Sequence, residues 1–278
     1  MKAFAVTVPR PEGYVHSHAF DDVATAVADG LRELGHDVLE TSSVNVPCRQ
    51  HIVFGATLLG PWQSQSLAAD AILYNLEQIE RGSEWCSDAY LELLAAHRVW
   101  DYSQSNAQAL AELGIQVERV VPIGWAGELE RVKPAQRRDI DVAFFGSMCS
   151  RRGDVLKAMS TIGLRTRAFF GVYGAERDAI LARSHLVLNV HMFEAKVLEA
   201  VRITYLLGNG CTVLSERGAN PDEDAPYEAA VGFADYEYLP AAALTLLCDE
   251  KLRHQLAVEG RKLMRRRPMR DYLREALA

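Results

Sequence analysis

Short apolar runs alternate with amphipathic stretches through the first half of the chain, which is the pattern of strands followed by helices. The apolar runs predict buried strands at residues 3–8, 36–41, 51–59, 71–75, 98–102 and 117–123. Apolar residues at helical spacing predict helices at 21–34, 87–97 and 105–113. Gly35 and Gly114 end the first and the last of these helices.

The same alternation restarts after a polar, charged segment at 131–138 that contains a proline. Strands are predicted at 141–145, 166–170, 185–190, 212–215 and 231–235, and helices at 152–159, 175–182, 194–207, 239–248 and 250–263, before a basic final helix. Repeated β–α–β units build parallel sheets with helices on both faces. We therefore predict an α/β protein with two Rossmann-like domains, 1–136 and 137–278, whose parallel sheets face a central cleft.

Composition is that of a globular protein, with 49% hydrophobic and 24% charged residues. The five cysteines are scattered and form no CxxC pair, which favours reduced, buried thiols over a disulfide framework or a zinc site. No apolar run is long enough to span a bilayer, and the N-terminus lacks the long apolar region of a secretory signal. We therefore expect a cytoplasmic protein without a transmembrane segment.

Charge is distributed unevenly along the chain. Residues 1–138 hold 18 acidic and 11 basic residues and account for the whole net charge of −7, whereas the remainder holds 19 of each. A nucleic-acid partner calls for a basic footprint, so none is expected. The less acidic second half is the expected place for a phosphate-bearing ligand. The basic tail at 265–270 is either a solvated helix or a contact for an acidic partner or, peripherally, a membrane surface.

The segment 185–216 is the most informative of the second half, since it predicts a strand, a short loop, a helix, a glycine cap and a second strand. The predicted helix begins near 192–194, and its free amides and dipole would form an anion site. Helical spacing places Lys196, Glu199 and Arg202 on one face of that helix. These side chains either bind a ligand, with Glu199 holding a ribose, or form a solvated, ion-paired surface.

This segment resembles the donor site of GT-B-fold glycosyltransferases, a superfamily that uses nucleotide sugars and has two Rossmann-like domains. In that family a strand–loop–helix carries two glutamates separated by seven residues, and the second stands in an LEA-type run. Leu198-Glu199-Ala200 matches that run, so the resemblance implies that Glu199 binds the ribose. His191 stands at the position of the first glutamate, and Glu194 lies nearby. The resemblance thus implies that His191 or Glu194 contacts the sugar.

The loop that follows the predicted strand at 141–145 contains Gly146, Ser147, Arg151 and Arg152. A glycine at a strand end followed by a basic helix start suits close approach to a pyrophosphate. Arginine also fits phosphate with two parallel hydrogen bonds, so Arg151 or Arg152 is a candidate for neutralising the diphosphate without a metal. The alternative is an ordinary strand–helix turn with solvated arginines.

A second glycine-containing loop, at 170–174, follows the next predicted strand. Gly171 and Tyr173 belong to it and are candidates for a wall against which a nucleotide base packs. An ordinary turn between strand and helix accounts for the same residues.

In the first half, the loop after the first strand contains His16 and His18. Imidazole is suited to proton transfer at neutral pH, so either histidine is a candidate base for an acceptor hydroxyl, with Asp21 or Asp22 as its orienting group. The alternatives are a surface loop and a helix cap. No third ligand for a metal is evident nearby, so no metal site is predicted. Polar groups at other strand ends, 75–78 among them, are candidates for lining an acceptor pocket.

The resemblance and the two-block layout together predict a metal-independent glycosyltransferase. Its substrates would be a nucleoside-diphosphate sugar, with no further cofactor, and an acceptor hydroxyl of unknown identity. In GT-B proteins the final helix commonly returns to the first domain, and we expect the same here. The alternatives are a non-catalytic nucleotide-sugar-binding or partner-supporting subunit, and a GT-B-like sugar-nucleotide epimerase.

Overall fold

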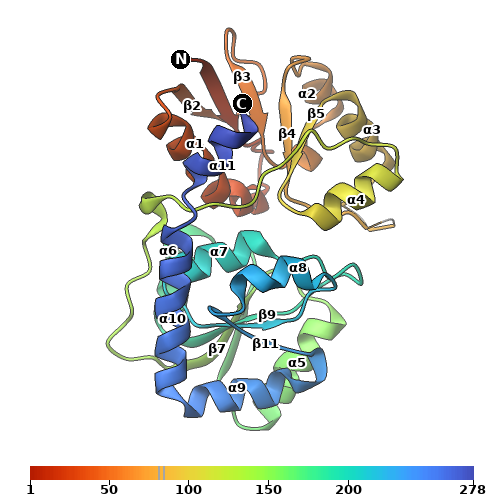
Figure 1. Cartoon of the computed structure of the whole chain (residues 1–278). Coiled ribbons are helices and arrows are strands. Elements are labelled where there is room, and N and C mark those ends of the chain that lie inside the picture. The colour runs from red at the N-terminus through yellow and green to blue at the C-terminus, as the bar shows by residue number, and fades with distance from the viewer. Residues whose placement is uncertain (81, 84) are drawn as a thin grey trace. The chain divides into compact units, whose positions relative to one another are not determined.

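A computed structural model describes residues 1–80, 82–83 and 85–278 of the chain. The chain forms two compact units, and each is described by itself (Figure 1). The first unit contains Met1–Glu128 together with Pro268–Ala278, and the second contains Leu129–Arg267.

The first unit is built on a sheet in the order β2-β1-β3-β4-β5-β6, and its strand pairs are parallel. The strands are β1 (Ala3–Thr7), β2 (Asp37–Thr41), β3 (Gln50–Val53), β4 (Ile72–Asn75), β5 (Arg98–Asp101) and β6 (Arg119–Val120). The helices are α1 (Asp21–Glu33), α2 (Pro61–Gln65), α3 (Asp88–Ala96) and α4 (Gln104–Glu112). The central strands are apolar on both faces, because helices cover the sheet on both sides.

The second unit repeats this plan with the order β11-β10-β9-β7-β8, again with parallel pairs. Its strands are β7 (Ile140–Phe145), β8 (Thr166–Phe169), β9 (Ser184–Asn189), β10 (Val213–Glu216) and β11 (Val231–Ala234). Its helices are α5 (Ser150–Thr161), α6 (Gly174–Ala182), α7 (Ala200–Gly208), α8 (Pro221–Asp224), α9 (Leu239–Cys248) and α10 (Glu250–Arg265). The predicted α/β class and the two parallel sheets are confirmed.

Strand order fixes where a ligand site is expected in each unit. The chain leaves β7 to form β8 on one side and returns to form β9 on the other, so β7 and β9 flank the point where the order reverses. In open α/β sheets, ligands bind beyond the carboxyl ends of the strands at this switch point. The corresponding point of the first unit lies between β1 and β3.

The helix predicted at 194–207 begins only at Ala200. Residues 191–199 form an irregular loop in which Lys196 has a φ of 44°, a left-handed value that a right-handed helix does not allow. Val197 and Leu198, whose apolar spacing predicted a helix, are buried although they stand in this irregular loop. Lys196, Glu199 and Arg202 therefore do not share a helix face, and the anion site predicted near 192–194 has no helix start to form it.

The second unit begins at Leu129, whereas the sequence placed the boundary at 136/137. The backbone N–H groups of Arg131 and Val132 both donate to Asn209 Oδ1, at 2.8 Å each, and Ala135 N donates to Ala182 O at 3.0 Å. These bonds attach the charged segment 131–138 to the second unit.

The final helix, α11 (Met269–Ala276), belongs to the first unit and packs along α1. Gly30 makes this packing close: a β-carbon there would lie 2.8 Å from Leu273 Cδ1 and 2.9 Å from the backbone nitrogen of Arg270. Arg270 also pairs with Glu33 at 2.7 Å. The absence of a side chain at one helical position thus sets how close α11 lies to α1.

Gly30→Ala should lower the stability of the first unit, although alanine is the better helix former by about 1 kcal/mol. The added methyl meets backbone atoms of α11, and such overpacking costs about 1–3 kcal/mol. All four tryptophans lie in the first unit, so tryptophan fluorescence during urea unfolding reports on it alone. Gly127→Ala, at a glycine of the same unit with open space around it, is the control. A Gly30→Ala midpoint equal to or above that of the wild type would contradict this packing.

Candidate donor-binding site

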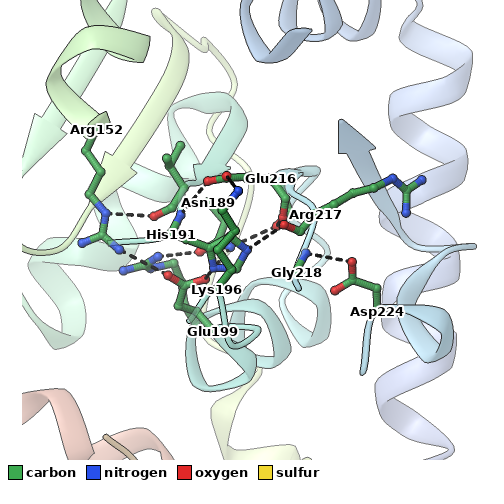
Figure 2. Close-up of polar contacts among 12 residues, drawn as sticks. Arg152, Asn189, His191, Lys196, Glu199, Glu216, Arg217, Gly218 and Asp224 are labelled. Atoms are coloured by element: carbon green, nitrogen blue, oxygen red, sulfur yellow. Dashed lines mark hydrogen bonds and ion pairs between the residues drawn. The ribbon is translucent and has the colours of Figure 1, made fainter. Parts of the chain in front are cut away.

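Charged side chains gather at the carboxyl ends of β7, β9 and β10 in the second unit (Figure 2). They come from the loop and first turn after β7, from the end of β9, from the loop 191–199, from α7 and from the end of β10. We call this set the switch-point cluster: Arg151, Arg152, Asn189, His191, Lys196, Glu199, Arg202 and Glu216.

Glu216, the last residue of β10, binds two basic side chains and one backbone N–H although its side chain is only 2% exposed. Arg151 binds it through two parallel hydrogen bonds, Nη1 to Oε2 at 2.9 Å and Nη2 to Oε1 at 2.7 Å. Lys196 Nζ lies 3.2 Å from Oε1, and the backbone N–H of His191 donates to Oε2 at 3.1 Å. Burial disfavours the ionised carboxylate, but these donors outweigh it and lower its pKa.

Glu199 stands at the N-terminal end of α7 and is also nearly closed off from solvent, with 12% of its side chain exposed. Asn189 Nδ2 donates to its Oε2 at 2.9 Å, and Arg152 Nη2 donates to its Oε1 at 3.3 Å. His191 Nδ1 lies 2.9 Å from Oε2 in an ion-pair contact that lacks the alignment of a regular hydrogen bond. Burial opposes ionisation of Glu199, but its contact with His191, the charge of Arg202 and the Asn189 bond together lower its pKa to about 2.

His191 is fully buried, and each of its ring nitrogens faces an acceptor. Nε2 lies 3.1 Å from the carbonyl oxygen of Arg217, and Nδ1 faces the carboxylate of Glu199. A ring with two acceptors is best satisfied when both nitrogens carry protons. Burial disfavours the charged ring, but Glu199 and Glu216 outweigh it and raise the pKa of His191. The imidazole therefore points at protein groups and holds Glu199 in place.

Arg152 is 4% exposed and fully engaged by the protein. Its Nε donates to Val190 O and its Nη1 to Ser147 O, both at 2.8 Å, and its Nη2 reaches Glu199. Its guanidinium also lies over the ring of Phe144. Arg152 thus ties the loop after β7 to the end of β9, and it places Ser147 through the backbone of that loop.

Arg202, on α7, differs from the other cations of the cluster because it pairs with no carboxylate among the described residues. It donates to Asn189 Oδ1 and lies over the rings of Phe144 and Phe145, and it forms no ion pair within 4 Å among the described residues. Burial lowers its pKa to about 10, so it stays charged at neutral pH. Gly146 allows this position, because a β-carbon there would lie 2.7 Å from Arg202 Nη2. Gly146 also has a φ of 133°, a conformation that favours glycine.

The cluster contains more positive than negative charge. Among the residues of the cluster, Arg151, Arg152, Lys196 and Arg202 stand against two carboxylates, Glu199 and Glu216, and a protonated His191 adds to the excess. The charge of the exposed Glu194 acts on Arg151 from outside the cluster. Asp224, which lies nearby and outside the cluster, accepts from Gly218 N, and burial raises the pKa of its carboxyl. Uncompensated buried charge is unfavourable, so this arrangement is suited to a ligand with at least two negative charges.

The remaining candidates from the sequence are not members of the switch-point cluster as defined above. Glu194 is exposed in the loop 191–199. Gly171 and Tyr173 follow β8, which pairs with β7, and Tyr173 stands just before α6. His16 and His18 belong to the first unit: His18 is exposed and bonds Asp21 at 2.7 Å, and His16 packs edge-on against Tyr14.

Two members of the cluster, Asn189 and Glu216, were not singled out from the sequence. The available signal was a polar side chain at the end of an apolar strand, since both residues close such runs. Among the described residues, no group of three or more His, Cys, Asp or Glu side chains could hold a metal ion. Over the same residues, none of the helices combines the length and the apolar character needed to cross a membrane.

No family model matches the chain, and neither does any curated protein. Solved structures do match over the full length. HepE of Anabaena, solved with UDP and glucose, has a TM-score of 0.66 at 12% identity and covers 100% of this chain and 99% of its own. AviGT4, a glycosyltransferase of avilamycin A biosynthesis, has a TM-score of 0.60 at 16% identity over 100% and 98% of the two chains. This chain has the GT-B fold.

A third GT-B structure, the lipopolysaccharide glycosyltransferase WaaG, matches with a TM-score of 0.60 at 13% identity over 99% of this chain and 98% of its own. The resemblance seen in residues 185–216 is therefore matched by the fold of the whole chain. At these identities the likeness establishes the GT-B fold, and the chemistry has to be argued from the cluster itself.

Glu199 should make the stability of the second unit depend on pH. Its pKa of about 2 in the folded state lies below the ordinary value of 4.5, so its contribution is present above about 4.5 and is lost as pH falls toward 2. That span corresponds to up to roughly 3 kcal/mol. Calorimetry of Glu199→Gln should show lower stability at pH 7 and a smaller loss between pH 5 and 2. The exposed Glu176→Gln is the control; equal acid profiles for wild type and Glu199→Gln would refute the claim.

Proposed function

We propose that the chain is a glycosyltransferase that moves a sugar from a nucleoside-diphosphate sugar to an acceptor hydroxyl. The observation that carries the proposal is the excess of positive charge in the switch-point cluster, at the place where an α/β sheet of this order binds its ligand. A nucleoside diphosphate supplies the missing negative charge, and the GT-B fold is the scaffold on which its structural neighbours act.

Arg202 is the residue that we propose for the diphosphate. A guanidinium has five N–H donors, and the contacts of Arg202 with protein acceptors reduce to the one with Asn189 among the described residues. Gly146 leaves room for this guanidinium at the end of β7, where a β-carbon would lie 2.7 Å from Arg202 Nη2. During transfer the bond from the sugar to the diphosphate breaks, and negative charge grows on the leaving group. A fixed cation in a site with little water stabilises that charge in the transition state.

Arg151 and Arg152 are candidates for a supporting role around the same diphosphate. Each is already bound to a buried carboxylate, Glu216 or Glu199. Their charges still act on a ligand at Arg202, because electrostatic interactions decay slowly in a buried site. In this proposal the arginines supply the positive charge that the leaving diphosphate needs, without a metal ion.

Addition of EDTA should therefore leave the rate of sugar transfer unchanged; a loss that Mg²⁺ or Mn²⁺ restores would contradict this assignment.

Glu199 is the candidate for binding the ribose, and its present contacts limit the number of ribose hydroxyls that it can bind. A carboxylate has about four acceptor positions, and Arg152, Asn189 and His191 already take three. One position is left, which suits one ribose hydroxyl better than two. UDP is the first nucleotide to test, because HepE was solved with UDP and glucose and also with UDP-glucose.

A second candidate function, binding of a sugar nucleotide without transfer, is favoured by one observation. His191 occupies the position where the family resemblance expects a sugar-binding glutamate, but its imidazole is fully buried and contacts Glu199 and the backbone of Arg217. It therefore presents no group to a sugar. A sugar nucleotide that binds tightly but stays intact when varied acceptors are added would support this second function.

Arg202→Ala should weaken nucleoside-diphosphate binding by about 10–100-fold, because a charge-assisted hydrogen bond contributes about 1.5–3 kcal/mol. The measurement is the thermal shift that UDP, GDP, ADP and dTDP produce in the wild type and in the variant. Arg165→Ala is a matched control, since Arg165 is an exposed arginine paired with Asp141 at the opposite, amino ends of β7 and β8. Equal shifts for wild type and Arg202→Ala would remove Arg202 from the site.

A further inference from the structure

The side-chain amide of Asn189, the last residue of β9, joins a buried anion of the switch-point cluster to a buried cation (Figure 2). Asn189 is itself fully buried. Its Nδ2 donates to Glu199 Oε2 at 2.9 Å and to Ser215 Oγ at 3.0 Å, and its Oδ1 accepts from Arg202 Nη1. Both N–H groups and the oxygen of this one amide are therefore engaged.

Ser215, on β10, determines which end of the amide faces which partner. It is the register partner of Asn189 across the two strands, and its hydroxyl donates to the carbonyl oxygen of Glu216 at 2.8 Å. A hydroxyl has a single proton, so Ser215 Oγ can only accept from Asn189. The ionised carboxylate of Glu199 is likewise only an acceptor. Both neighbours require the NH₂ group of the amide, and its oxygen is left to face Arg202.

The guanidinium of Arg202 is held by two kinds of contact. The rings of Phe144 and Phe145 have their centroids 5.6 Å and 5.4 Å from its central carbon, and such contacts favour a position against the rings. They do not select which nitrogen points where. The hydrogen bond from Nη1 to Asn189 makes that selection, and Nη2 then lies against Gly146 at the end of β7.

We propose that Asn189 is the positioning residue of the diphosphate site, whose amide turns Nη2 of Arg202 toward the phosphate groups of the nucleotide. The inference rests on the proposed function. Hydrogen bonds in a chain polarise one another, so the negative charge of Glu199 makes the amide oxygen a better acceptor for Arg202. The same amide links the residue proposed for the ribose to the residue proposed for the diphosphate.

Asn209 provides a matched comparison, because it is a second buried asparagine of the same unit. Its Oδ1 accepts from the backbone N–H groups of Arg131 and Val132, and its Nδ2 donates to the carbonyl oxygen of Tyr205. These bonds serve the backbone and involve no member of the switch-point cluster. Loss of the Asn209 amide should therefore cost stability without changing how the unit binds a nucleotide.

The test is a double-mutant cycle in which calorimetry measures the binding of UDP, with GDP, ADP and dTDP as further probes. Asn189→Ala should raise the Kd about 10-fold, as for loss of one hydrogen bond to a charged group. In the Arg202→Ala background the same substitution should change the Kd by less than about 2-fold, because Asn189 acts through Arg202. Asn209→Ala should lower the Tm and leave the Kd within about 2-fold of the wild type.

A second readout needs no ligand and follows rotation of the Arg202 guanidinium about its Nε–Cζ bond by NMR, with assignment by comparison with Arg202→Ala. We expect slow rotation in the wild type and faster rotation in Asn189→Ala. Asn189→Ser, whose side chain is one bond shorter, should behave in the same way and replaces Asn189→Ala if that variant does not fold.

Three results would overturn the inference while the proposed function stands. They are an unchanged Kd in the Asn189 variants, a loss of equal size in the Arg202→Ala background or in Asn209→Ala, and guanidinium rotation as fast in the wild type as in the variants. A wild type that binds none of the four nucleoside diphosphates instead contradicts the proposed function.

Discussion

Glu199 and Glu216 hold the second unit together at the carboxyl ends of its strands, because they are the buried anions around which its buried cations gather. Each is fixed by donors from other elements: Arg151 and Arg152 from α5, Asn189 from β9, His191 and Lys196 from the loop 191–199. Removing one partner of such a set leaves an unpaired buried charge, at a cost of about 3–5 kcal/mol. The irregular loop between β9 and α7 follows from this constraint, since it delivers both His191 and Lys196 to the carboxylates.

The two units use the same strand order with different chemistry at the strand ends. In the second unit charged groups dominate and positive charge is in excess, which suits a diphosphate. In the first unit the strand ends carry neutral amides, a phenol and Asp101, and the amides hold the backbone of Glu77.

Much of the fold could be predicted from the sequence, because it depends on local pattern. Helix 239–248 was placed at its observed bounds, and the strands at 98–102 and 141–145 came within a residue or two. The helix predicted from residue 194 was wrong, because the apolar spacing of Val197 and Leu198 reflects burial of an irregular loop, and periodicity does not distinguish the two.

The candidate site was less predictable, since it depends on contacts between distant residues. Gly146 and Glu199 stood out because a strand-end glycine and an LEA run are visible locally. Arg202 stood out through a helical spacing to Lys196 and Glu199 that the structure contradicts. Glu216 did not, because its role depends on β10 lying beside β9 so that Arg151 and Lys196 reach it. Glu77 was visible only as one polar group at a strand end, and one of the bonds that hold its backbone comes from Asn106, 29 residues further along the chain.

The most direct test of the central claim, that the excess positive charge of the switch-point cluster binds a diphosphate, is a crystal structure of the chain with a nucleoside diphosphate at saturating concentration. The account predicts the diphosphate at the carboxyl ends of β7 and β9, with Arg202 within hydrogen-bonding distance of a phosphate oxygen and Gly146 beside it. An ordered nucleotide bound elsewhere, or a cluster that stays unoccupied while the guanidinium of Arg202 keeps only Asn189 as its partner, would contradict it.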